Sequence, residues 1–175
     1  MSKQKLKKEL QKLTKEQLIE QILDLYEKNK SVKEIYDFYL NPEGEEDLAQ
    51  KYIKIILNEF NMQNPDRAGL KFSVAKRAIS DFKRLSPSAE SIADVMMTLP
   101  EAACRFTHEW GDMTEGFYTS AAKNFDAALE YISANDLLSN FKLRAERCVE
   151  WASPCGYGFE DEINDIFDDY YLNIS

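Results

Sequence analysis

The sequence has few of the residues that build turns, disulfides and metal sites. Its 175 residues include only six glycines, five prolines, three cysteines and one histidine. So little turn-forming material disfavours sandwiches, barrels and many-stranded sheets. The cysteines Cys104, Cys148 and Cys155 lack the C-x-x-C spacing of zinc and redox sites, so we expect reduced thiols. We predict no cofactor.

Long apolar runs are also missing. The lysine-rich N-terminal residues lack the continuous apolar stretch of a signal peptide. No segment approaches the roughly 20 apolar residues that a membrane span requires. We therefore expect a cytoplasmic protein that has no membrane span.

Aromatic and acidic residues are abundant instead. Ten Phe, nine Tyr and two Trp supply large apolar side chains for a core, which argues against disorder. The formal net charge is −9, and this acidic balance weighs against nucleic acid as a partner because phosphates are repelled. A chain of this length is typical of one domain.

Apolar residues recur at spacings of three and four along nearly the whole chain, which indicates helices. Thr14 and Gln17 have capping-box spacing, and Gly111 is placed to end a helix. We expect Pro100 to kink or interrupt the helix that contains it. The fold class is all-α, with about nine or ten helices packed as antiparallel hairpins. They form either a helical-repeat-like α-α superhelix or an irregular bundle.

The domain expectation follows from the absence of a long linker. Residues 1–175 are predicted to form a single all-helical domain. Within it, residues 43–172 form an array of helical hairpins, and the N-terminal helices of residues 1–40 dock on that array.

Three stretches together resemble a known family. They are residues 13–26 (LTKEQLIEQILDLY), residues 73–82 (SVAKRAISDF) and residues 156–161 (GYGFED). They are similar to a bacterial family of small all-helical proteins of unknown function, and the similarity spans essentially the whole chain. The resemblance implies an independent helical domain, and it implies no activity, ligand or catalytic residue.

One candidate site for chemistry surrounds the single histidine. Cys104 and His108 lie four residues apart and so share a helix face, with Glu109 and Asp112 close by in sequence. Cysteine and histidine are good zinc ligands, so an enzyme or metal site around His108 is one alternative function. A buried cysteine beside a hydrogen-bonded histidine explains the same residues without any function.

Charge is concentrated in three stretches. Residues 1–15 hold six lysines, and residues 67–84 hold the candidate basic patch. Such patches attract phosphates, so nucleic-acid binding through residues 67–84 is the first alternative function. The acidic residues Asp161, Asp165 and Asp168 share a face of the last helix; they could hold a cation, or they form a solvated surface. The patch consists of Lys76, Arg77, Lys83 and Arg84.

The leading hypothesis is a non-enzymatic module that binds an unknown protein or peptide. It rests on helical hairpins, which create extended grooves, and on the lack of a catalytic constellation. Exposed aromatic side chains would anchor the partner. The aromatic candidates are Tyr36, Tyr39, Trp110, Trp151 and Tyr157.

Overall fold

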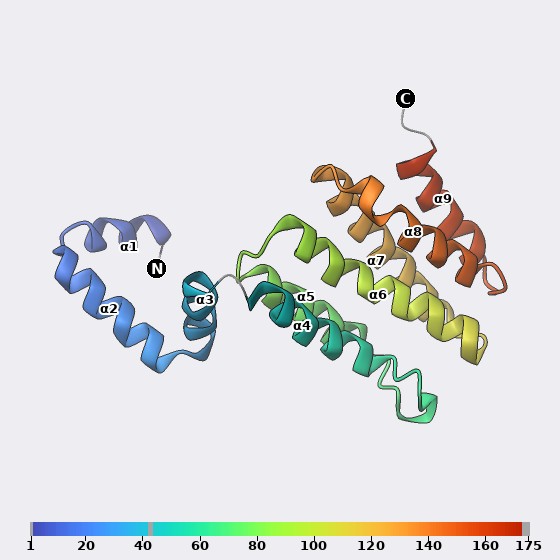
Figure 1. Cartoon of the computed structure of the whole chain (residues 1–175), viewed down its shortest axis with the longest axis horizontal. Helices are drawn as coiled ribbons and strands as arrows, with labels where there is room; N and C mark the ends of the chain where they lie inside the picture. Colours follow the sequence, from blue (N-terminus) through green and yellow to red (C-terminus); the bar gives the residue numbers. More distant parts are fainter. Residues whose placement is uncertain (1, 42–43, 173–175) are drawn as a thin grey trace. The chain divides into compact units, whose positions relative to one another are not determined.

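The computed structural model describes residues 2–41 and 44–172 (Figure 1). Contacts along the chain divide it into two compact units, residues 1–44 and residues 45–175. The described secondary structure is all helical, which confirms the predicted fold class. The single domain, with residues 1–40 docked on the rest, stays a prediction.

Nine α-helices lie within the described residues, in agreement with the expected nine or ten. Those of residues 1–44 are α1 (Lys3–Leu10), α2 (Lys15–Lys28) and α3 (Lys30–Leu40). Those of residues 45–175 are α4 (Glu45–Glu59), α5 (Phe72–Lys83), α6 (Ala89–Trp110), α7 (Glu115–Ala134), α8 (Leu138–Ala152) and α9 (Phe159–Tyr171). A 3₁₀ turn at Pro65–Arg67 precedes α5.

Helix α6 is the central element of residues 45–175. It packs against α4, α5, α7 and α8, and thirteen of its 22 residues are buried. Ala93 and Ala103 let neighbouring helices approach closely, while Val95, Met97 and Leu99 fill the space between them. Helix α9 packs against α7 and α8 (Figure 1). This packing is consistent with both predicted forms, a bundle or a superhelix.

Aromatic rings form a large part of the same core. The ring of buried Phe60 lies 5.5 Å from that of Phe72 and 6.3 Å from that of Phe117, measured between centroids. The neighbouring Tyr118 ring stacks on Phe159 at 4.6 Å. Each such pair contributes about 0.5–1.5 kcal/mol beyond the area it buries. The rings therefore link the end of α4 through α7 to the start of α9.

Two of the predicted helix signals are present, and one of the two effects expected of Pro100 is absent. Thr14 and Gln17 form a reciprocal capping box at the start of α2, and Gly111 ends α6 at a φ of 97°. The predicted interruption at Pro100 does not occur, because α6 continues through it to Trp110. Proline removes one helical hydrogen bond. Pro100 and the residues around it are buried, and this packing keeps the helix continuous.

Polar contacts reinforce the packing of residues 45–175 at two places. Arg144 on α8 donates to the Glu101 carboxylate, with its Nε 2.8 Å from Glu101 Oε1, and also to Asp94; both acids lie on α6. At the α6–α7 loop, the Tyr118 hydroxyl donates to Asp112 Oδ1 at 2.7 Å. The same Asp112 oxygen accepts the Gly156 N–H at 3.1 Å. This second network joins the α6–α7 loop to the α8–α9 loop.

The helices of residues 1–44 have no comparable core. None of the residues in α1, α2 or α3 is buried. Helices α2 and α3 contact each other through Tyr26, whose ring lies 6.4 Å from that of Tyr36 and whose hydroxyl donates to Asp37 at 2.5 Å. This hydrogen bond, together with the negative charge of Asp37, raises the pKa of Tyr26. A few side chains thus hold α2 against α3.

Candidate interaction surface

The most unusual feature of the described chain is the apolar surface that residues 2–41 leave exposed. Leu25 on α2 is 53% exposed and Tyr39 on α3 is 76% exposed. Single exposed apolar side chains are normal, but a concentration of them marks an interaction site. The exposed large apolar side chains of this unit are Leu6, Ile19, Ile22, Leu23, Leu25, Ile35, Tyr39 and Leu40.

The first of two hollows in this unit lies beside α1 and has a volume of about 500 Å³. Its apolar floor comes from Leu6 and Leu10 of α1 and Leu18 of α2. Leu6, Leu10 and the lysines Lys3 and Lys7 share one side of α1 because they lie three or four residues apart. We call this the α1 hollow: an apolar depression bordered by positive charge.

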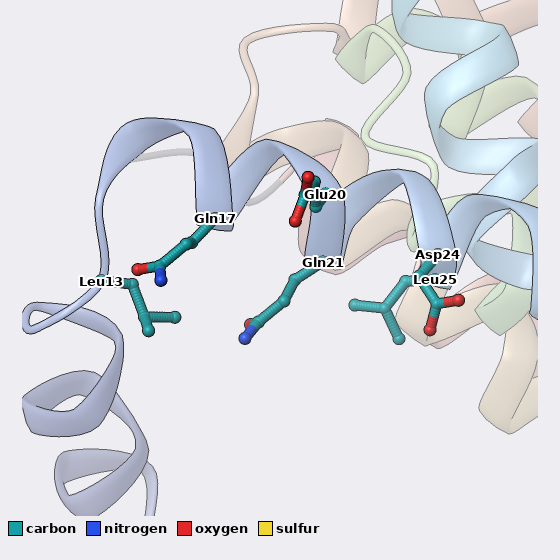
Figure 2. A pocket seen from close by; sticks show the side chains of 6 residues that line it. All are labelled: Leu13, Gln17, Glu20, Gln21, Asp24 and Leu25. Carbon is teal, nitrogen blue, oxygen red and sulfur yellow. The ribbon is translucent and has the colours of Figure 1, made fainter.

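The second hollow has a volume of about 520 Å³ and lies along α2 (Figure 2). Leu13 and Leu25 provide its apolar ends, with glutamine side chains between them (Figure 2). The acidic residues Glu20 and Asp24 line it too, and Asp24 forms an ion pair with Lys28. We call this the α2 hollow, in which the bordering charge is negative.

The two hollows are lined by residues on one face of α2. Leu18 lines the α1 hollow, and Gln21 and Leu25 line the α2 hollow. These residues are spaced by three and four, which places them on a single face of the helix. Together the two hollows form the α1–α2 surface, with an apolar floor, a basic border on α1 and an acidic border on α2.

The predicted aromatic anchors lie in both units. Tyr36 and Tyr39 are on α3, while Trp110, Trp151 and Tyr157 belong to residues 45–175. Tyr39 and Trp110 are exposed. Trp151 lines a hollow of about 170 Å³ to which α4, α6 and α8 contribute, and the exposed Tyr157 ring lies 6.1 Å from that of Tyr118. Their role as partner anchors stays a prediction.

Three of the four residues of the predicted basic patch already have partners on the protein. Arg77 and Arg84 both pair with Asp81, at 3.7 Å and 3.2 Å. The ammonium group of Lys83 lies 4.7 Å from the centroid of the Tyr131 ring, and burial lowers the pKa of Lys83. Only Lys76 projects without such a contact among the described residues. Nucleic-acid binding through residues 67–84 stays a prediction.

The residues around the single histidine are not gathered into one site. Cys104 is fully buried in α6, whereas His108, Glu109 and Asp112 are exposed. Cys104 contacts Cys148 of α8, and burial raises the pKa of Cys148. Within residues 2–41 and 44–172, no three His, Cys, Asp or Glu side chains are placed to hold a metal ion.

The acidic residues of α9 have different environments. Asp161 and Asp165 are exposed, while Asp168 is half-buried. Glu160 bonds to Ser153 at 3.0 Å and so helps to fix the turn before α9. Cation binding by this face stays a prediction.

Sequence reasoning did not identify the leucines and isoleucines of α1–α2 as a site. The sequence does contain a signal that could have identified them. Eight- and eleven-residue helices flank α2, and helices this short rarely persist without burial of an apolar face. The pattern therefore indicates an apolar helix face that another surface buries, but it does not identify that surface.

The fold and the α1–α2 surface define an all-helical protein that exposes apolar side chains on residues 2–41. The chain belongs to DUF6155, a family of unknown function, whose model matches residues 1–171. This confirms the resemblance to an all-helical family of unknown function. A comparison with curated proteins and a comparison with solved structures gave no match. No helix in the described part of the chain is long and apolar enough to cross a bilayer.

Proposed function

We propose that this protein is a non-enzymatic binding module that takes up a protein partner on the α1–α2 surface. The observation that carries the proposal is the contrast between the two units. Residues 45–175 bury a large core, whereas α1, α2 and α3 have no buried residue although they contain regularly spaced apolar side chains.

The energetics of short helices support the same proposal. Isolated helices shorter than about 12–15 residues are marginal in water, and α1 and α3 have eight and eleven residues. Leu6 and Leu25 are 56% and 53% exposed, so covering each contributes about half of the roughly 1.5–3 kcal/mol that complete burial of an exposed leucine gives. A protein partner that covers the α1–α2 surface would stabilise these helices as it binds.

Capture of partners from the lysate of the source cell, with matched variants of the full chain, tests this function. Leu25→Glu places a charge in the α2 hollow. Leu143→Glu places the same charge on α8, where Leu143 is 71% exposed and lines neither hollow. Capture is compared at low and high salt, with and without nuclease.

We expect the unmodified chain and Leu143→Glu to retain a stoichiometric protein after nuclease treatment, and Leu25→Glu to lose it. Equal capture by all three chains would overturn the proposal, and so would a chain that captures no other protein and does not associate with itself. Material that is recovered only at low salt and disappears with nuclease would favour the alternative, nucleic-acid binding through Lys76, Arg77, Lys83 and Arg84.

A further inference from the structure

We infer that the partner of the α1–α2 surface is a second copy of this chain, related to the first by a two-fold axis. The inference rests on the proposed function and specifies its partner. The order of charges along this surface is complementary to that of the same surface on a second, rotated copy.

The two borders of the surface carry opposite charge. Lys3 and Lys7 border the α1 hollow, and Glu20 and Asp24 border the α2 hollow. In a two-fold dimer, if residue i of one copy contacts residue j of the other, then j also contacts i. Rotation of one copy by half a turn about this axis places the basic border of each copy against the acidic border of the other. The apolar floors of the two copies then cover each other.

Most of the charges needed for this contact are not engaged elsewhere in the described chain. Within residues 2–41 and 44–172, Lys3, Lys7 and Glu20 form no ion pair, in contrast to Lys12, which pairs with Glu9 at 2.9 Å. Exposed pairs of this kind contribute little to affinity, but they determine register and partner choice. The apolar floor supplies the attraction and the charges select the partner.

A polyanionic partner fits the same surface less well. Membranes and nucleic acids present negative charge alone, and they would bring it against Glu20 and Asp24 as well as against the lysines. Residues 1–44 contain nine lysines and eight acidic residues, so the unit as a whole offers almost no net attraction to a polyanion. A partner of mixed charge matches both borders.

Charge exchange within the full chain tests the inference. Lys7→Glu places an acidic residue beside Lys3 on the basic border, and Glu20→Lys places a basic residue beside Asp24 on the acidic border. The substitution Glu20→Lys places a lysine four residues from Glu16 and from Asp24, so α2 itself is not weakened by it. Lys8→Glu is the matched control, since Lys8 changes the charge of α1 equally and lines neither hollow.

Sedimentation equilibrium across a range of concentrations measures the dimer. We expect Lys7→Glu and Glu20→Lys each to raise its dissociation constant about tenfold, because two symmetric attractions become repulsions. Lys8→Glu should leave it near the original value. The double variant Lys7→Glu/Glu20→Lys should restore dimerisation, as should an equimolar mixture of the two single variants.

An unmodified chain that stays monomeric, or a double variant no better than either single one, would overturn the inference. So would a dimer that none of the substitutions weakens. These failures are distinguishable from failure of the proposed function: a monomeric chain that captures another protein, and loses it on Leu25→Glu, has a binding surface with a different partner.

Discussion

At the scale of single residues, the Tyr118 hydroxyl links three parts of the molecule. It donates to Asp112 and accepts the Met113 N–H at 3.0 Å, and it lies 2.9 Å from the Thr107 hydroxyl. The hydrogen bond from Tyr118 and the one from the Gly156 N–H both favour the ionised form of Asp112, so they lower its pKa. The carboxylate therefore joins the two loops more strongly when it is charged.

The lowered pKa of Asp112 predicts that this carboxylate makes a contribution to folding stability that is lost in acid. Because the pKa of Asp112 is lower in the folded chain than in the unfolded one, the contribution of Asp112 to the free energy of unfolding is fully present above the unfolded pKa. It is lost as the pH falls through the folded pKa. We expect the free energy of unfolding in urea to fall between about pH 5 and pH 3, and Asp112→Asn to remove part of that fall.

Asp165→Asn is the matched control, because Asp165 on α9 forms no hydrogen bond or ion pair among the described residues. Its pH profile should follow that of the unmodified chain. An Asp112→Asn profile that also coincides with the unmodified one would show that the loop network contributes nothing that depends on ionisation.

At the scale of helices, Arg144 joins α8 to α6. Burial works against its charge, but the hydrogen bonds and the charges of Glu101 and Asp94 outweigh that effect and raise its pKa. Removing Arg144 would leave Glu101, whose side chain is 17% exposed, without a counter-charge.

We expect Arg144→Ala to lower the free energy of unfolding by about 2–4 kcal/mol, since an uncompensated, mostly buried carboxylate is costly. Arg147→Ala is the control on the same helix. Arg147 is exposed and forms no ion pair among the described residues, so its removal should cost less than about 0.5 kcal/mol. Equal effects of the two substitutions in urea unfolding would contradict this account of the α6–α8 contact.

The helices themselves could largely be predicted from sequence, because apolar spacing and caps are local properties. Thr14 with Gln17 and Gly111 each mark a boundary that the structure confirms. The helix is not interrupted at Pro100, although the loss of one hydrogen bond is a local cost. The burial around Pro100 that offsets this cost depends on α4, α7 and α8, which the local sequence does not specify.

At the scale of the whole molecule, charge and burial are unevenly distributed. Residues 45–175 contain 13 basic and 23 acidic residues, whereas residues 1–44 are nearly balanced. Nearly neutral, apolar surface is suited to protein contacts, while strong net charge of one sign disfavours self-association. The division at Gly44 thus separates two surfaces of different character.

The candidate site could be predicted only in part, because burial depends on distant parts of the chain. The sequence identifies Leu18, Ile22 and Leu25 as one apolar stripe, because helical spacing is local. Whether such a stripe is buried or exposed depends on residues far away in the chain. The aromatic candidates Trp110 and Tyr157 were selected by residue type, and type does not reveal which apolar surface is left uncovered.

Amide hydrogen exchange of the full chain, diluted until it is monomeric, tests the central claim most directly. We expect residues 15–28 and 30–40 to exchange far faster than α6, because their helices lack a buried core. Leu25→Glu should leave their exchange rates unchanged. Protection of these residues as strong as that of α6, and its loss on Leu25→Glu, would mean that the apolar face is already covered in the isolated molecule. That result would contradict the proposed binding surface.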